Sequence, residues 1–181
     1  MKKSFSLAFV LLTVVGMTSL LIGCNGSQTN SSDQKITFSC EQKDQDWTTT
    51  VKNGQKTSDL IKWQRTDFVK VGFPPQRRCQ EVTPRLQEAH DNRSLPSLTY
   101  GEMLDEKGKK QQVLCTDDQD KKQCKTLILT LLSSDDPQEQ LKKFTAVLNG
   151  DAGPSIQSSC EPIDERLHCS VNINNVFTKK K

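Results

Sequence analysis

Histidine is scarce in this chain of 181 residues, which contains only His90 and His168. A serine or cysteine nucleophile needs a neighbouring base, and histidine is the usual one. No Gly-x-Ser-x-Gly sequence surrounds a serine, and the chain lacks a glycine-rich phosphate loop and a dinucleotide fingerprint. The interpretation favoured for His90 is a cation near a helix end, and His168 lies beside a cysteine that we expect to be oxidised. We therefore expect no cofactor.

The chain also lacks a large excess of positive or negative charge. The formal net charge is +3, and it falls to +1 without Lys2 and Lys3. No basic stripe with interleaved aromatic residues occurs, and aromatic residues make up 6% of the chain. The composition therefore gives no support for nucleic-acid binding, and we expect no nucleic-acid partner.

What the chain does have is an apolar N-terminal run. Two lysines are followed by an uncharged stretch, Phe5–Ile22, which ends in Leu21-Ile22-Gly23-Cys24. This order is typical of an export signal, and the final four residues resemble the lipobox of bacterial lipoproteins. We predict a lipoprotein signal peptide over residues 1–23 and lipidation at Cys24. An uncleaved membrane helix is the alternative, and either one places the rest of the chain outside the cytoplasm at a membrane, on the periplasmic side.

The segment after Cys24 contains no apolar residue up to Gln34. Such a segment has nothing to bury, so we predict a flexible tether over residues 24–34. The remaining length suits one folded unit, and we predict a single globular domain over residues 35–178.

Six further cysteines follow, an even number that in an exported chain indicates disulfide bonds. Zinc is the rival interpretation, but the spacing of these cysteines is wider than zinc-ligand spacing. Two pairs flank polar turns, which predicts the disulfides Cys115–Cys124 and Cys160–Cys169. The remaining pair is then Cys40–Cys79.

Residue patterns predict a mainly antiparallel sheet with two helices, a disulfide-stapled α+β fold. The predicted strands are Ile36–Cys40, Trp47–Val51, Leu60–Trp63, Leu98–Met103, Gln112–Cys115, Cys124–Leu132 and Ser170–Asn174. We expect Cys124–Leu132 to be central because it is apolar on both faces. Asp136-Pro137 starts a predicted helix over 137–148, whose buried face contains Leu141, Phe144 and Leu148.

The first predicted helix contains Cys79, Val82, Leu86 and Ala89 at helical spacing. Pro84 lies inside this pattern, so the helix either bends there or begins there with Thr83 as its cap.

Four side chains near these elements have two interpretations each. Arg77 and Arg78 form either an anion site or a solvated helix flank, and we favour the flank. Trp47 and Trp63 either stack on a ligand or pack in the core, and we favour the core.

Asp117, Asp118 and Asp120 are the best candidates for a metal site. Hard cations prefer several oxygen ligands, which a loop of carboxylates supplies. The spacing does not match a calcium loop, and Lys121-Lys122 lies beside it. We therefore predict a solvated hairpin tip and no bound metal.

Several short stretches together resemble one family, the cyanobacterial circadian-oscillating polypeptides, which are exported and membrane-associated. The stretches are Phe38-Ser39-Cys40, Ile61-Lys62-Trp63, Arg77-Arg78-Cys79, Leu98–Gly101, Val113-Leu114-Cys115, and Cys124 with Leu127-Ile128-Leu129. The resemblance covers about Ile36 to Leu148 and implies location and fold unity, but no active site.

Two function classes remain from the sequence. The first is a membrane-anchored, non-enzymatic binding or envelope-associated module with an envelope protein partner, and it is the one we predict. The second is a periplasmic hydrolase whose carboxylates are dispersed along the chain. A dispersed active site leaves no local motif, so the sequence alone does not separate them.

Overall fold

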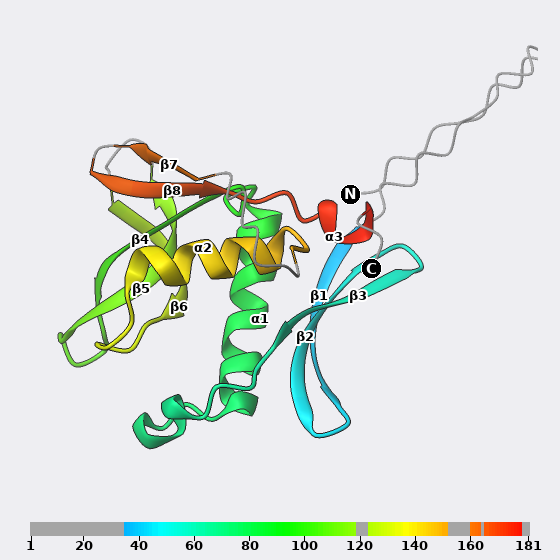
Figure 1. Ribbon diagram of the computed structural model, residues 1–181, viewed down its shortest axis with the longest axis horizontal. Coiled ribbons are helices and arrows are strands. Elements are labelled where there is room, and N and C mark those ends of the chain that lie inside the picture. The colour runs from blue at the N-terminus through cyan, green and yellow to red at the C-terminus, as the bar shows by residue number, and fades with distance from the viewer. Residues whose placement is uncertain (1–34, 119–122, 152–159, 164, 179–181) are drawn as a thin grey trace, which may run out of the picture. The chain divides into compact units, whose positions relative to one another are not determined.

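The computed structural model describes residues 35–118, 123–151, 160–163 and 165–178 (Figure 1). All of these residues lie in one compact unit, Asp33–Lys181. The predicted signal peptide, Cys24 and the tether fall outside the described residues. Within the described ranges, no helix has the length and apolar character needed to cross a membrane.

The first three strands form an antiparallel sheet of order β1-β2-β3. They are β1 (Ile36–Lys43), β2 (Asp46–Asn53) and β3 (Lys56–Lys62). Gly54 has a φ of 59° in the turn between β2 and β3, a left-handed conformation that glycine adopts without strain. All three strands were predicted, the first from alternation and the second from β-branching, and the structure confirms them.

The other five strands form a second antiparallel sheet, of order β6-β5-β4-β8-β7. They are β4 (Ser97–Leu104), β5 (Lys110–Asp118), β6 (Gln123–Thr130), β7 (Cys160–Ile163) and β8 (Arg166–Ser170). The predicted α+β class is confirmed, with its strands divided between two sheets instead of one.

The prediction that Cys124–Leu132 is a central strand is wrong, because β6 lies at the edge of its sheet. Its apolar character has another cause. Ile128 is fully buried because α1 (Pro75–Asp91) packs against β6, while Leu127 and Leu129 stay half-exposed. A covering helix therefore produced the apolar pattern that the sequence analysis attributed to a central position.

Helix α1 begins at Pro75. This is nine residues before Pro84, the residue at which the sequence analysis allowed either a bend or a helix start. Pro74 is the N-cap and Pro75 occupies the first turn, where a missing N–H costs nothing. The helix continues through Pro84, so a start at that residue is excluded. Thr83 is buried inside the helix, and its hydroxyl lies 2.7 Å from that of Thr49 on β2.

Helix α1 contacts strands of both sheets: β1 and β2 of the first sheet and β6 of the second (Figure 1). Its buried side chains include Cys79, Val82 and Leu86. The helix therefore joins the two sheets through one continuous core.

Helix α2 (Pro137–Leu148) begins as predicted. The Asp136 carboxylate accepts a 2.8 Å hydrogen bond from the Glu139 N–H, and Pro137 follows the cap. The helix packs on β4, β5 and β8 and also contacts β3. The predicted buried face is confirmed and consists of Leu141, Phe144 and Leu148.

The predicted edge strand Ser170–Asn174 is wrong, because β8 ends at Ser170. The Asn149 side chain takes the place of a strand partner. It donates to the Ser170 carbonyl at 3.1 Å and accepts from the Asn172 N–H at 2.7 Å. Val171 and Ile173 are still buried, so the alternation indicated the faces correctly but not the strand.

Two short helices were not predicted. The 3-10 helix η1 (Asp67–Val71) precedes α1, and α3 (Asn175–Thr178) follows the second sheet. Each is too short to produce a periodic pattern in the sequence.

Phe144→Ala is predicted to reduce the free energy of unfolding by about 3–5 kcal/mol, because it leaves a cavity under α2. Lys143→Ala, next to it on the exposed face, removes only a surface pair with Glu139 and should cost about 0.5 kcal/mol or less. Chemical denaturation of both variants is the measurement. Equal stabilities would show that α2 is not part of the core.

Candidate binding cleft

Three disulfides crosslink the domain: Cys40–Cys79, Cys115–Cys124 and Cys160–Cys169. These are the three pairs expected from the turns and from the remaining cysteines. Two of them close short hairpins, whereas Cys40–Cys79 spans 39 residues and ties β1 to α1. No thiol among these six cysteines is free to act as a nucleophile or metal ligand.

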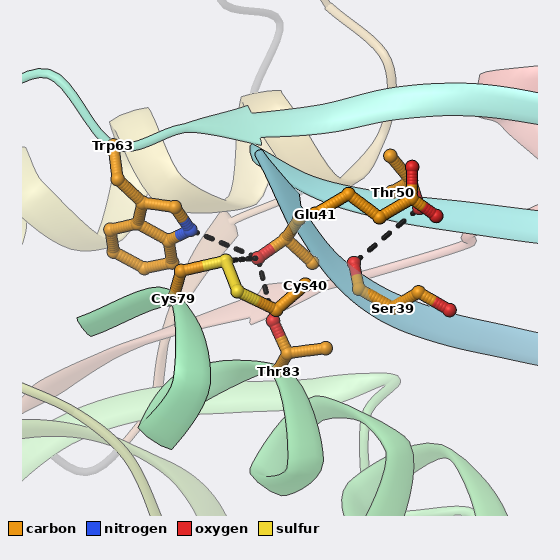
Figure 2. The surroundings of a disulfide bond; sticks show 8 residues. Ser39, Cys40, Glu41, Thr50, Trp63, Cys79 and Thr83 are labelled. Carbon is orange, nitrogen blue, oxygen red and sulfur yellow. Dashed lines mark hydrogen bonds between the residues drawn. A yellow bond between two sulfur atoms is a disulfide. The ribbon is translucent and has the colours of Figure 1, made fainter. Parts of the chain in front are cut away.

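The Cys40–Cys79 bond lies in a buried polar cluster with Trp63 and Thr83 (Figure 2). The Thr49 hydroxyl accepts a 2.9 Å hydrogen bond from the Trp63 indole N–H and lies 3.9 Å from the Cys79 sulfur. Trp63 is 5% exposed, which confirms the core interpretation over ligand stacking. Trp47 is half-buried and packs against the same core.

A cleft of about 390 Å³ opens where η1, the first half of α1, β5 and the end of β6 meet. On α1, Arg78, Val82 and Arg85 recur at spacings of four and three, so they project from one face of the helix. The remaining apolar lining comes from Phe68, Val71, Phe73, Leu129, Leu131 and Leu132. The volume falls in the range typical of ligand sites.

Arg78 is the most deeply buried cation of this lining, at 6% exposure. Its guanidinium carbon lies 4.7 Å from the centre of the Phe68 ring and 5.5 Å from that of Trp63, and one terminal nitrogen donates to the Arg65 carbonyl. Its Nε is buried without a hydrogen-bond partner in the described part of the protein. The prediction of a solvated helix flank is therefore wrong for Arg78, although Arg77 is exposed.

Two carboxylates beside η1 and α2 pair with another arginine, Arg65. Arg65 donates to Asp67 and, at 3.0 Å, to Asp135, whose side chain is 6% exposed. Among the described residues, Arg78 has no ion pair. Burial lowers the pKa of Arg78, the positive charge of Arg65 lowers it further, and Asp67 opposes the shift. Because an arginine stays protonated throughout, the cleft contains a desolvated positive charge.

The rim of the cleft is also basic. Lys109, Lys110 and Arg85 line it, and Glu81 is the one carboxylate among the lining residues. Asp105 shapes the β4–β5 turn that presents the lysines, because its carboxylate accepts the backbone N–H of Lys109 at 2.8 Å.

That hydrogen bond lowers the pKa of the Asp105 carboxyl. Because this pKa is lower in the folded state than in the unfolded chain, the stabilisation from the ionised Asp105 is complete at pH values above the ordinary pKa of aspartate. It is lost as the pH falls through the lowered pKa, so the turn keeps this contribution at neutral pH.

The prediction that Asp117 lies at a solvated hairpin tip is wrong. Its side chain is 7% exposed, lies 3.2 Å from His168 Nδ1 and 3.5 Å from Arg166, and joins β5 to β8 across the sheet. The Nε2 of His168 is buried and has no hydrogen-bond partner within the described ranges. The sequence analysis missed this pair because its two members lie on strands distant in sequence.

The metal interpretation finds no further support in the described residues. No group of three His, Cys, Asp or Glu side chains there is placed to hold a metal ion. Asp120 and the adjacent lysines lie outside the described residues. His90, the second histidine, is half-buried near the end of α1, and its ring lies in an edge-to-face arrangement with that of Phe38.

Sequence reasoning named only one residue of the cleft as a candidate, Arg78, and interpreted it as solvated. The other lining residues come from four segments that no local motif connects. The Arg77-Arg78 doublet was the available signal, since it lies directly before a cysteine of the core.

The fold and the cleft define a disulfide-crosslinked α+β domain with an open site of cationic and apolar character. The family described as Circadian oscillating protein COP23 matches residues 37–178, and the chain belongs to this family. The match includes Cys160 and Cys169, so the expectation that the resemblance ends near Leu148 is wrong. No curated protein and no solved structure matches the chain. The family description refers to circadian oscillation and specifies no reaction.

Gly101→Ala is predicted to destabilise the domain by about 1–3 kcal/mol, because a Cβ at this β4 position would lie 2.8 Å from the Cys124 sulfur. The disulfide to Cys115 prevents that sulfur from moving aside. In a background carrying Cys115→Ala and Cys124→Ala, the same change should be neutral or stabilising, since alanine suits a strand better than glycine. Denaturant unfolding of the four variants measures this, and an equal cost in both backgrounds would contradict the contact.

Proposed function

We propose that this protein is a lipid-anchored, extracytoplasmic binding module that recruits an envelope protein partner and catalyses no reaction itself. The observation that carries the proposal is the cleft, which combines an apolar lining with a buried arginine lacking an ion pair. Such a site is equipped to hold a partner group, because an anion would compensate the desolvated charge.

Two features support the location. The lipobox-like stretch ending at Cys24 provides a membrane anchor on the periplasmic side, and the residues after it provide reach. The three disulfides suit an oxidising compartment outside the cytoplasm.

The chemistry of the cleft favours binding over catalysis. Its charged lining residues are four cations and Glu81, and neither histidine is among the lining residues. Glu81 is engaged by Arg77 at 2.6 Å and by Arg85 at 3.5 Å, so its charge is already neutralised. These groups can bind and orient an anion, and we assign them no proton-transfer step.

One observation favours a second candidate, the periplasmic hydrolase with dispersed carboxylates. Asp117 and His168 form a carboxylate–imidazole pair whose free nitrogen has no described partner. Similar pairs orient the base in hydrolases. We rank this candidate second because the pair lies in the interior of the sheet and is not part of the cleft lining.

The anchor is tested by the mass of the mature N-terminus. We expect the chain to begin at Cys24, with the mass of the lipid attached, and Cys24→Ser to release the protein from membranes. A retained Met1 or a free Cys24 thiol in the isolated protein would contradict the lipoprotein assignment.

Partner capture is tested by crosslinking the anchored protein in the envelope. Val71→Asp, at an exposed cleft residue, should reduce capture, whereas Ile163→Asp on β7 is the matched control and should not. The Cys24→Ser variant should capture less, because the anchor raises the effective concentration.

Single substitutions of Asp117, Asp118, His90 or His168 are expected to leave this capture largely unchanged. The same variants are assayed for hydrolysis by the purified protein. An activity that disappears with one of these substitutions would favour the hydrolase and overturn the binding module.

A further inference from the structure

The cleft brings two kinds of chemistry into one site. Its apolar lining includes Phe68, Val82 and Leu131, which are themselves buried. Lys109 lies on the rim, and among the described residues its ammonium group has no ion pair. A ligand that fills this site has to bury an apolar group and place a negative charge beside it.

Arg78 shows where that charge is most needed. A guanidinium has five N–H donors, and the described bonds of Arg78 use one terminal nitrogen, toward the Arg65 carbonyl. The two aromatic contacts supply no hydrogen-bond acceptor oxygen, and Nε has no partner among the described residues. A carboxylate at this edge would form charge-assisted hydrogen bonds in a region already shielded from water.

The surroundings of the cleft indicate that the occupant is larger than a small molecule. Val71 on η1 belongs to the cleft wall, yet it is 57% exposed. A small ligand inside the cleft would cover only the part of Val71 that faces it. A protein segment that continues past the cleft would cover the rest of this side chain and leave polar groups at the rim, as in other protein interfaces.

We propose that the cleft binds an extended segment of a partner protein in which an acidic side chain lies beside a large apolar one. In this arrangement Arg78 receives the carboxylate, the apolar lining receives the neighbouring side chain, and Lys109 adds attraction at the rim. This inference rests on the proposed binding function and specifies the chemistry of the segment that is recognised.

The test uses the full mature chain in detergent and two fluorescent peptides capped at both ends. One peptide alternates leucine with glutamate, and the other alternates leucine with glutamine. We expect the glutamate peptide to bind about tenfold tighter or more, which corresponds to one charge-assisted hydrogen bond. Its affinity should also fall as salt is added.

Substitutions identify the cations responsible. Arg78→Gln should remove the preference for glutamate, and Arg78→Lys should restore only part of it, since lysine lacks the planar fork. Because Arg78 is buried, Lys109→Glu provides an exposed variant that should weaken the glutamate peptide several-fold. Lys52→Glu, an exposed site on β2 outside the cleft, is the matched control and should have no effect.

Equal affinities for the two peptides, or an equal effect of Lys109→Glu and Lys52→Glu, would overturn the inference. Free laurate that binds in the cleft while both peptides fail would also overturn it, in favour of a small amphiphile. Envelope capture that depends on Val71 but not on charge would leave the binding module standing and reject only this recognition chemistry. A preference for the glutamate peptide without envelope capture would support the proposed recognition chemistry of the cleft and reject the proposed envelope protein partner.

Discussion

The disulfide between Cys40 and Cys79 is the constraint on which the rest of the domain depends. It closes a loop of 39 residues, which is worth about 4 kcal/mol in the chain-entropy treatment, and it ties the first strand to α1. Because α1 also packs against β6, this one crosslink positions a helix that joins both sheets. Arg78 immediately precedes Cys79, so the bond that secures the core also determines where the buried cation of the cleft lies.

The burial of Arg78 destabilises the isolated domain. Removing a guanidinium from water without a carboxylate partner costs free energy, and aromatic contacts together with one carbonyl recover only part of it. Asp67 and Asp135 are close by, but both are bound by Arg65. A local conflict of this kind is typical of a functional site, where stability is given up for recognition. The buried Asp117–His168 pair differs, because there a carboxylate and an imidazole lie 3.2 Å apart across β5 and β8, whereas Arg78 has no ion pair with a carboxylate among the described residues.

The sequence predicted those parts of the fold that depend on interactions between residues close together in the chain. Helix α2 was predicted from Asp136 and Pro137 because a cap and a first-turn proline act within a few residues. The edge position of β6 was not predictable in this way, since a helix distant in sequence covers Ile128. Arg78 was misinterpreted for the same reason: its burial comes from Phe68 and Trp63, which precede it on η1 and after β3. The cleft combines four separate segments, so its only signal in the sequence was Arg78, the second member of the Arg77-Arg78 doublet.

The most direct test of this account is to observe the Nε–H group of Arg78 itself. In a nitrogen-15 correlation spectrum of arginine side chains, this resonance is assigned by its absence in Arg78→Lys. Addition of the leucine–glutamate peptide should shift it, because a carboxylate that binds the guanidinium changes the electric field at this buried atom. A spectrum in which Arg78 stays unchanged while exposed arginines such as Arg77 shift would contradict the account.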